Sequence, residues 1–398
     1  MKVLQIDVNY GQGSTGRIAQ ALVQGLRARG HEATACFGRG PKVSEEGIYK
    51  FGIDFETYAH AVFTRITGYT GRYSPCSTMR LIKYIEQYNP DIIHIHELHA
   101  YFVSLSPLLK FIKQLGIPVV WTFHCEFMYT GKCGHADDCD GWQHKCGHCP
   151  KLHDYVSTIW FDKTSEMLEE KKRLLKNLNL TIVTPSQWLA DRVGLSFLSD
   201  KPIYVIHNGI DTNVFRPTQA EYLRNILGIP NENKVVLALA PKLMSDNKGG
   251  MRVLDFASRM SSSAITFLMV GVENVSSWKS TDNVIMLPPT SNLDLLAKLY
   301  SLADIFLIFS KKENYPTTCL EAQACGTPVL GFDVGGIKES IQHGLVVPYM
   351  DMKAAQQSLF SLLNSKPFDP YLDNLGNEDM VNAYLSLYEQ VLEQNRKA

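Results

Sequence analysis

Short, continuous runs of apolar residues recur along this chain, and segments with helical spacing separate them. Five runs lie in the first half and six in the second: 3–8, 33–37, 92–95, 119–122, 181–184, 203–206, 235–238, 266–270, 284–287, 305–308 and 329–331. Uninterrupted apolar runs, in contrast to alternating ones, predict parallel strands that helices cover on both faces. Eleven strands are too many for one typical sheet, and 398 residues suffice for more than one domain. The sequence therefore predicts an α/β protein with two domains of similar size.

The join between the domains has no distinctive linker composition, and we place it shortly after the strand at 181–184. We expect residues 1–187 to form the first domain and residues 188–375 the second. The last segment has apolar residues at helical spacing, namely Met380, Val381, Tyr384, Leu387, Tyr388 and Val391. We expect residues 376–398 to form a helix that packs back on the first domain.

Composition excludes several functional classes. The chain has 39 Lys and Arg against 40 Asp and Glu, a net charge of −1, which argues against a basic nucleic-acid-binding protein and against an acidic disordered one. Its longest apolar runs, 235–241 and 265–270, are far shorter than the ~20 residues that span a bilayer. The first residues read as a strand without a signal-peptide cleavage pattern, so we expect a cytoplasmic protein.

Residues 11–16, Gly-Gln-Gly-Ser-Thr-Gly, follow the first predicted strand and match the pattern G-x-G-x-x-G. Glycines in this pattern let the backbone approach a phosphate at a helix N-terminus, and we expect the helix to begin near Arg17. A nicotinamide site requires an acid at the end of the second strand, where this chain has Arg39 and no acid. Three interpretations stay open: phosphate contact, an NADP-dependent oxidoreductase in which Arg39 binds the 2′-phosphate, and a structural turn.

A second polar loop follows the predicted strand at 305–308 and contains Glu313 and Glu321, which seven residues separate. Pro316 and a helix expected to start near Thr317 place a helix N-terminus at the carboxyl end of a parallel strand, where α/β folds bind ligands. Carboxylates accept hydrogen bonds from neighbouring sugar hydroxyls, so this arrangement suits a nucleotide-sugar. Taken alone, the two acids could equally be solvated residues that flank a helix.

The segments Gly-Thr-Pro-Val at 326–329 and Gly-Gly-Ile-Lys-Glu at 335–339 surround this loop, and together they resemble the donor site of glycosyltransferase family 4. Asn-Gly-Ile-Asp at 208–211 and the stretch from Lys242 to Lys248 are similar to the same family. The resemblance implies the GT-B fold, with two Rossmann-like domains facing across a cleft. It also implies a retaining reaction that uses no catalytic metal or cofactor.

The resemblance assigns a role to each matching residue. Glu313 would contact hydroxyls of the donor sugar, and Glu321 those of the ribose. Lys242 and Lys248 would neutralise the diphosphate leaving group. The residues after Glu313 would bind the sugar and phosphates: Asn314, Tyr315, Pro316, Thr317 and Thr318. Lys242 stands where the family commonly has Arg, and lysine lacks the bidentate fork of arginine.

The first half resembles the bacterial exopolysaccharide and capsule branch of this family, which includes colanic-acid glycosyltransferases. The similarity rests on the histidine-rich segment at 90–99, on Trp-Thr-Phe-His-Cys at 121–125 and on the cysteines that follow. It implies that Gly13, Ser14 and Thr15 reach over the donor phosphate or the acceptor.

His124 matches the family histidine near the reacting centre, where it would hydrogen-bond or position the donor sugar; a structural histidine is the alternative. Cys125 follows it, where the branch usually has Asp. Three more histidines lie on or just after the preceding strand: His94, His96 and His99. They allow three interpretations, namely metal ligands, core histidines, or acceptor contact by His96 or Glu97.

Four of the nine cysteines lie within 17 residues of one another, in the spacing C-x5-C-x6-C-x2-C: Cys133, Cys139, Cys146 and Cys149. Four thiolates suit a tetrahedral structural Zn²⁺, and a metal would stabilise a segment that is rich in Gly, Asp and His. An iron–sulfur cluster, and reduced or disulfide-linked cysteines, remain as alternatives. In every case we expect this cysteine-rich segment, an insertion at residues 125–150, to support an acceptor-side loop.

The same branch implies a glycan acceptor on a lipid carrier such as polyprenyl diphosphate. Residues 58–73 are aromatic with two arginines and no acid, so they could contact a membrane or the acceptor lipid, or form an ordinary packed helix. We therefore expect a retaining glycosyltransferase that uses a nucleoside-diphosphate-sugar, with UDP as the expected nucleotide, in exopolysaccharide, capsule or O-antigen synthesis at the inner face of the plasma membrane. The alternatives are the NADP-dependent oxidoreductase and a catalytically silent nucleotide-sugar-binding subunit.

Overall fold

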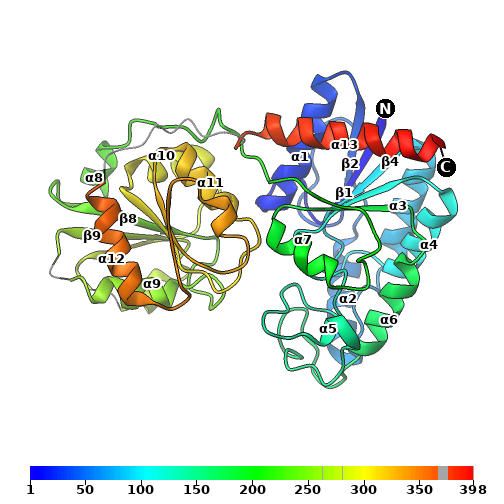
Figure 1. Ribbon diagram of the computed structural model, residues 1–398, viewed down its shortest axis with the longest axis horizontal. Coiled ribbons are helices and arrows are strands. Elements are labelled where there is room, and N and C mark those ends of the chain that lie inside the picture. Colours follow the sequence, from blue (N-terminus) through cyan, green and yellow to red (C-terminus); the bar gives the residue numbers. More distant parts are fainter. Residues whose placement is uncertain (262, 280, 366–374, 398) are drawn as a thin grey trace. The chain divides into compact units, whose positions relative to one another are not determined.

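Figure 1 shows the computed structural model of the chain, which describes residues 1–261, 263–279, 281–365 and 375–397. The chain forms two compact units: unit 1 comprises Met1–His207 with Asn377–Ala398, and unit 2 comprises Asn208–Gly376. Each unit contains one parallel sheet with helices on both faces. Of the ranges predicted for the second domain and the tail helix, residues 262, 280, 366–374 and 398 lie outside the described residues.

The sheet of unit 1 has the strand order β3-β2-β1-β4-β5-β6-β7, and all of its strand pairs are parallel. Its strands are β1 (Lys2–Asp7), β2 (Glu32–Phe37), β3 (Ile48–Lys50), β4 (Ile92–Ile95), β5 (Val119–Thr122), β6 (Leu180–Thr184) and β7 (Ile203–Val205). The sheet of unit 2 has the order β10-β9-β8-β11-β12-β13, also parallel. Its strands are β8 (Lys234–Leu239), β9 (Ile265–Val270), β10 (Val284–Leu287), β11 (Ile305–Ile308), β12 (Val329–Phe332) and β13 (Gly344–Val347). The predicted α/β class with parallel sheets is confirmed.

The helices of unit 1 are α1 (Gly13–Ala28), α2 (Asp54–Thr67), α3 (Pro75–Tyr88), α4 (Leu105–Leu115), α5 (Gly141–His144), α6 (Thr164–Leu175), α7 (Gln187–Gly194) and α13 (Asn377–Lys397). Helices α1 and α13 cover one face of the sheet, where Val3 and Val120 join their cluster. Helices α3, α4, α6 and α7 cover the other face, together with Leu4 and Trp121 from the same two strands. Neighbouring strand residues point to opposite faces, so a strand covered on both faces is apolar throughout.

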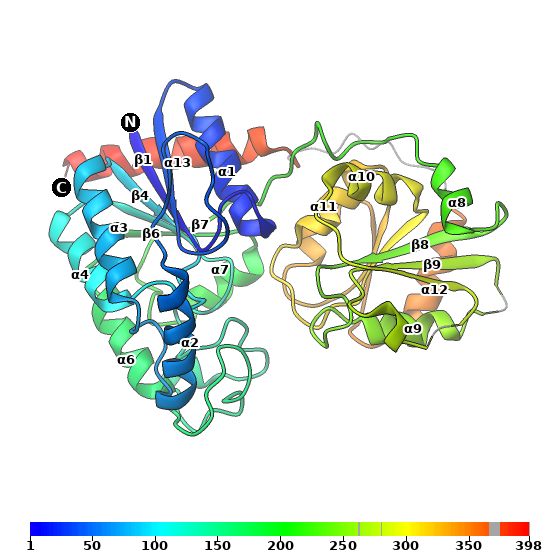
Figure 2. The same ribbon diagram turned by 180° about the vertical axis from the view of Figure 1, so that it is seen from behind.

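The helices of unit 2 are α8 (Tyr222–Leu227), α9 (Gly250–Ser258), α10 (Leu293–Leu302), α11 (Thr317–Ala324) and α12 (Met352–Leu363), with short 3-10 turns at η1 (Val275–Ser277) and η2 (Lys338–Ser340). Helices α10 and α11 pack over one face with Val235 and Phe306, and α9 and α12 over the other with Val236 and Leu307 (Figure 2). The same alternation of buried side chains therefore forms both cores.

The C-terminal helix α13 lies beside α1 in unit 1 (Figures 1 and 2). Its buried residues are the six apolar positions identified in the sequence: Met380, Val381, Tyr384, Leu387, Tyr388 and Val391. Gly25 of α1 makes the close approach possible, because a Cβ there would lie 2.6 Å from Cγ2 of Val381. On the strand side, the Tyr384 hydroxyl lies 2.8 Å from Oγ1 of Thr122. Helix α13 thus completes one face of the first sheet.

The structure differs from the sequence prediction at the junction of the units and at two sheet edges. Unit 1 extends to His207 instead of ending at residue 187, because Ile182 of β6 pairs with Ile203 of β7 and α7 packs into the same core. Strands β3 and β13 are additional edge strands, and both are at least half-exposed over most of their length. Helix α1 begins at Gly13, one turn before Arg17. Within the described ranges, none of the helices combines the length and apolar character that a bilayer span requires.

Candidate functional site

Two loops at the carboxyl end of the second sheet bring together a lysine and a glutamate that the sequence singled out. Lys248 precedes α9 and Glu313 lies between β11 and α11; the lysine Nζ donates a hydrogen bond to Oε1 of Glu313 at 2.6 Å. The Lys248 side chain is 35% exposed and that of Glu313 is 12% exposed. A backbone hydrogen bond from Lys311 N to Asn247 O, 2.8 Å long, joins the same loops. The ion pair therefore lies where two connected loops meet, with its lysine open to solvent.

Two glycines allow the backbone to pass close to these loops. Gly249 has φ +79°, and a Cβ there would lie 2.1 Å from the carbonyl oxygen of Phe309. Gly335 has φ +58°, and a Cβ there would lie 1.8 Å from the carbonyl oxygen of Glu313. Any larger residue at either position would displace a loop. The Gly-Gly-Ile-Lys-Glu segment thus supports the backbone of Glu313 by close packing.

Helix α11 starts at Thr317, as the sequence predicts. Pro316 precedes it and has no side-chain group that can cap the first turn, so the amides of Thr317 and Thr318 lie at the positive end of the helix dipole. Nδ2 of Asn208 donates to the carbonyl oxygen of Tyr315 at 3.2 Å and holds the entrance to the helix. The helix N-terminus is therefore suited to an anionic ligand.

Glu321 lies one turn further along α11 and is 2% exposed. The Tyr300 hydroxyl, from α10, donates to its Oε2 at 3.1 Å. Burial, followed by the charge of Glu321, raises the pKa of Tyr300 well above its ordinary value, so the hydroxyl remains a donor. Tyr300 belongs to another helix and gave no signal in the sequence. Asn314, in the loop before α11, is buried as well.

The second predicted phosphate-binding lysine, Lys242, lies in the same loop as Lys248, between β8 and α9. Lys242 is exposed and borders a hollow of about 320 Å³, whose lining includes Gly271, Glu273 and Trp278. Gly271 has φ +98°, and a Cβ there would lie 1.6 Å from the carbonyl oxygen of Ala240. Both lysines therefore belong to one loop. Among the ion pairs of the described residues, Glu313 is paired with Lys248 and not with Lys242.

In unit 1, His94 is a core residue. Its Nδ1 lies 2.5 Å from the Tyr388 hydroxyl and its Nε2 lies 2.7 Å from Oγ1 of Thr122. Burial, and then the nearby His124, lowers the pKa of His94 well below its ordinary range. Because both ring nitrogens have protein partners, the structure supports the core interpretation of His94.

His96 connects the strand to His124. Its Nε2 lies 2.8 Å from Oε1 of Gln5, and its Nδ1 lies 3.1 Å from Nε2 of His124. His96 is 2% exposed, whereas His124 is half-buried at the end of β5. Burial lowers the pKa of His124 to about 4, so its imidazole is neutral at neutral pH. His96 therefore holds His124 in place, and His124 is the more accessible of the two.

The first glycine loop connects β1 to α1. Gly13 and Ser14 are exposed in the first turn of the helix, and Thr15 is half-buried. Gly16 packs against the preceding strand end, since a Cβ there would lie 3.2 Å from the carbonyl oxygen of Asn9. The exposed first turn of α1 keeps the phosphate-contact interpretation open.

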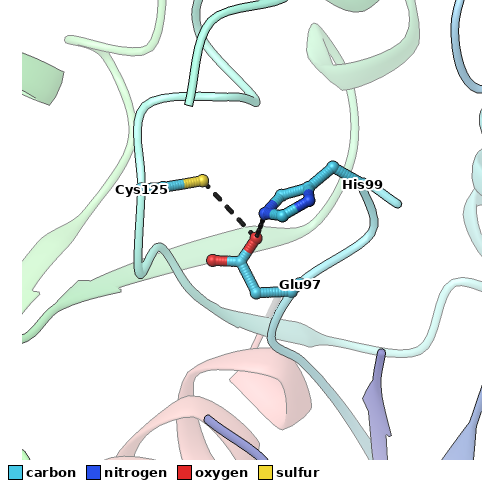
Figure 3. Close-up of side chains that lie close together, drawn as sticks. All are labelled: Glu97, His99 and Cys125. Atoms are coloured by element: carbon cyan, nitrogen blue, oxygen red, sulfur yellow. Dashed lines mark hydrogen bonds and ion pairs between the residues drawn. The ribbon is translucent and has the colours of Figure 1, made fainter. Parts of the chain in front are cut away.

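Glu97, the second residue predicted to contact the acceptor, lies in a compact group with His99 and Cys125 (Figure 3). His99 Nε2 is 2.5 Å from Oε2 of Glu97, and the Cys125 thiol donates to the same oxygen at 3.4 Å. Burial acts to raise the pKa of Glu97, but the charge and hydrogen bond of His99 outweigh it and lower that pKa to about 2. Burial also acts to lower the pKa of His99. The charge of Glu97, and to a smaller extent that of Cys125, outweighs burial and raises this pKa well above the usual range.

The cysteine-rich segment is held by two buried lysines. Nζ of Lys132 donates to the carbonyl oxygens of Leu152, Asp154 and Val156. Nζ of Lys171, on α6, donates to those of Phe127, Thr130 and Gly131. Sequence reasoning missed both lysines as structural anchors, because their acceptors are backbone atoms.

The four cysteines of this segment do not converge on one point. Cys133 and Cys149 share a hydrogen bond that raises the pKa of the former and lowers that of the latter to about 6. Sulfurs in a tetrahedral Zn(Cys)4 site lie about 3.8 Å apart. Among the described residues, no three of these four sulfurs lie within 4.8 Å of one another. The ligand atoms of Glu97, His99 and Cys125 do. Whether this segment binds zinc stays a prediction.

Both units match known glycosyltransferase families. Residues 15–214 match Glycosyltransferase Family 4, and residues 234–365 match Glycosyl transferases group 1. A colanic acid biosynthesis glycosyl transferase of Escherichia coli (strain K12), WcaC, is 23% identical over 371 residues, which are 86% of this chain and 85% of that protein. The D-inositol 3-phosphate glycosyltransferase of Mycolicibacterium smegmatis is 30% identical over 190 residues, 45% of this chain and 42% of that protein.

Solved structures share the fold over the whole chain. The catalytic domain of starch synthase IV from Arabidopsis thaliana, bound to ADP and acarbose, has a TM-score of 0.66 at 17% identity, covering 100% of this chain and 99% of that one. Sucrose-phosphate synthase from Thermosynechococcus elongatus has a TM-score of 0.62 at 16% identity, covering 100% and 98%. Anabaena HepE in complex with UDP-glucose has a TM-score of 0.55 at 14% identity, covering 100% and 99%. The two parallel-sheet α/β domains are thus those of the GT-B fold.

Proposed function

This chain belongs to glycosyltransferase family 4 and is a glycosyltransferase of the GT-B type, and on that premise we propose that it is a retaining enzyme. It transfers a sugar from a nucleoside-diphosphate-sugar, with UDP as the nucleotide, to a glycan on a polyprenyl-diphosphate carrier. The product is a bacterial exopolysaccharide, capsule or O-antigen. The oxidoreductase alternative is dropped, because both halves of the chain match glycosyltransferase families.

The observation that carries the donor assignment is the pairing of Lys248 with Glu313 next to the start of α11. A half-exposed ammonium and the amides of a helix N-terminus both attract the diphosphate, whose charge grows as the glycosidic bond breaks. Glu313 has one oxygen on Lys248 and a second oxygen that can accept from a sugar hydroxyl. The ammonium of Lys248 and the carboxylate of Glu313 therefore suit a ligand that has phosphates at one end and hydroxyls at the other.

His124 supports the proposal from unit 1. A histidine with a pKa of about 4 is a weak base, suited to hydrogen-bonding a sugar hydroxyl rather than to removing a proton. In the proposed reaction the bond from the anomeric carbon to the diphosphate breaks, and a bond to the acceptor oxygen forms on the same face. The acceptor proton passes to the departing phosphate oxygen, and Lys248 stabilises the negative charge.

The lipid-linked acceptor and the membrane association are supported by an apolar surface on α2 and the segment at 159–161. Its side chains are large, apolar and more than one-third exposed: Phe55, Tyr58, Val62, Phe63, Ile66, Ile159, Trp160 and Phe161. The two parts are adjacent, since Ile159 N donates to the carbonyl oxygen of Arg65 at 2.9 Å. An exposed apolar helix face with a flanking cation is typical of peripheral membrane binding. This surface overlaps the region at 58–73 that the sequence singled out and adds Phe55 and residues 159–161 to it.

Binding of nucleotide-sugars to the full chain tests the donor assignment. We expect calorimetry with UDP-sugars and GDP-sugars to find a UDP-sugar that binds most tightly. Lys248→Ala should weaken its binding 10- to 100-fold, roughly the 1.5–3 kcal/mol of a charge-assisted hydrogen bond. Glu321→Gln, which preserves shape, should weaken it as well. Lys298→Ala is the matched control, because Lys298 pairs with Asp294 on the surface of α10.

If Lys248→Ala and Glu321→Gln both bind like the wild type, the donor assignment is wrong. Transfer to a synthetic polyprenyl-diphosphate glycan, with the product anomer determined by NMR, tests the remaining parts. An inverted anomer would refute the retaining reaction. Tight donor binding without turnover on any such acceptor would favour the silent nucleotide-sugar-binding subunit.

A further inference from the structure

Three side chains of different chemistry converge at the carboxyl end of the first sheet. Glu97 and His99 follow β4, and Cys125 follows β5, so adjacent parallel strands deliver them to one place. Figure 3 shows the carboxylate, the imidazole and the thiol pointing toward one another. The side chains of Glu97 and His99 are 8% and 22% exposed. Across the described residues, this group has three potential ligand atoms within 4.8 Å of one another.

The arrangement is not that of a nucleophilic cysteine with a relay histidine. In such a relay, the acid and the nucleophile bind opposite nitrogens of one imidazole. Here His99 Nε2 and the Cys125 sulfur both approach the same oxygen, Oε2 of Glu97, at 2.5 and 3.4 Å. The other nitrogen, Nδ1, lies 3.4 Å from the Tyr155 hydroxyl. Cys125 also hydrogen-bonds the imidazole of His99, so each of the three groups contacts the other two, as the ligands of one metal ion would.

The distances are close to those of tetrahedral coordination. With bonds of about 2.3 Å to sulfur and about 2.0–2.1 Å to nitrogen and oxygen, ligand atoms around zinc lie roughly 3.3–3.6 Å apart. The present separation of 3.4 Å between the sulfur of Cys125 and Oε2 of Glu97 falls in that range. The shorter contact between His99 and Glu97, 2.5 Å, would open by less than about 1 Å.

The surroundings match what metal ligands usually have around them. A histidine that binds a metal commonly uses its second nitrogen for an outer hydrogen bond, and Tyr155 stands at that position for His99. The backbone of Glu97 is fixed as well, because its N–H donates to Oδ1 of Asp7 at 3.2 Å.

We propose that Glu97, His99 and Cys125 bind a Zn²⁺ ion and leave one coordination position for an oxygen ligand. A thiolate and an imidazole favour zinc over Mg²⁺, Ca²⁺ or Mn²⁺, which prefer all-oxygen sites. Three protein ligands with a fourth position open are typical of zinc ions that bind a water or a substrate oxygen. The inference rests on these three side chains alone and holds whether or not the donor assignment is correct.

Cobalt(II) is the probe for the test, because its absorption reports both tetrahedral geometry and sulfur ligation. Chelator-treated full-length protein titrated with Co²⁺ should develop visible ligand-field bands and a thiolate-to-cobalt band, and Zn²⁺ should then displace the cobalt. Cys125→Ser and His99→Gln should each weaken metal binding at least about 100-fold, more than the loss of an outer partner. Cys125→Asp should retain the metal and lose the thiolate band, which separates ligation from misfolding.

Two cysteine variants serve as controls. Cys76→Ser removes an exposed thiol of α3, and Cys149→Ser disrupts the cysteine-rich segment. Both should leave the Cys125-dependent band unchanged. The proposal is overturned if wild-type protein shows no thiolate-to-cobalt band, or if the whole band survives Cys125→Ser and disappears in Cys149→Ser. In the latter case the metal would belong to the cysteine-rich segment.

Discussion

Replacing Lys171 by methionine should loosen the cysteine-rich segment and leave every predicted donor-binding residue untouched. The Lys171 side chain is buried, and its ammonium donates to the carbonyl oxygens of Phe127, Thr130 and Gly131 at 2.5, 2.9 and 3.3 Å. These residues open the segment, so one side chain of α6 fixes its first turn. Burial lowers the pKa of Lys171 to about 7, so its charged and neutral forms have similar populations at neutral pH.

The magnitude follows from the acceptors. Methionine has nearly the volume of lysine, so the cavity left behind is small and the loss comes from the carbonyls that lose their donor; that of Phe127 keeps a long contact of 3.5 Å with Oγ1 of Thr130. Each buried, unsatisfied polar group costs about 1–3 kcal/mol. Removing a buried ammonium offsets part of this sum, which places the net loss near its lower end, about 3 kcal/mol. In a unit of this size, that loss lowers the melting temperature by about 6–12 °C.

Calorimetry of the full chain measures this loss, and hydrogen exchange locates it. Amides in residues 126–163 should exchange faster in Lys171→Met, while those of β1 and β4 should stay protected. Arg173→Met is the matched control, since Arg173 is an exposed residue of the same helix. It should change stability by less than about 0.5 kcal/mol. Equal losses in both variants, or a loss below about 1 kcal/mol in Lys171→Met, would refute the reasoning.

Three further outcomes are expected. Burial lowers the pKa of His60 from 6.5 to about 4, so between these pH values the unfolded chain binds a proton that the folded chain does not. His60 should therefore account for about 2 kcal/mol of the stability lost between pH 7 and pH 5, and His60→Asn should lose about 2 kcal/mol less than the wild type over that range in urea unfolding. Val381→Asp places a charge between α13 and α1 and should cost at least about 3 kcal/mol, with α13 becoming sensitive to limited proteolysis. Gly271→Ala forces a Cβ against the carbonyl oxygen of Ala240 and should cost about 3 kcal/mol by calorimetry, whereas Gly228→Ala, with φ +69° and open space, should cost about 1.

The sheets could be predicted because burial on both faces leaves a local signal. Val3 and Leu4 belong to opposite cores, and both must be apolar, so the strand appears in the sequence as a continuous run. Strand β3 lies at an edge with all three residues half-exposed, and nothing in its own sequence requires it to pair. The junction of the units was misplaced for a related reason. The run at 203–206 reads as a strand, and only its pairing with β6 shows which sheet it joins.

The candidate donor site was predictable where function depends on residue type. Glu313 and Lys248 were found separately, although their ion pair joins positions 65 residues apart. Tyr300 was not found, because a tyrosine inside an amphipathic helix carries no signal that its hydroxyl faces Glu321. The cysteine spacing suggested one metal site, whereas the structure brings ligand atoms together at Cys125, which the spacing had set apart. Local patterns identify chemical groups, and only the fold determines which of them meet.

The C-terminal helix contributes to the chemistry of His124 through a chain of hydrogen bonds. Nε2 of Gln5 donates to the Tyr388 hydroxyl of α13 at 3.3 Å, which leaves Oε1 of Gln5 to accept from Nε2 of His96 at 2.8 Å. His96 therefore carries its proton on Nε2, and its Nδ1 accepts from Nε2 of His124 at 3.1 Å. The proton of His124 is thereby placed on Nε2, and its Nδ1 is the acceptor nitrogen of a neutral ring. The packing of α13 on the first sheet thus helps to set the tautomer of His124.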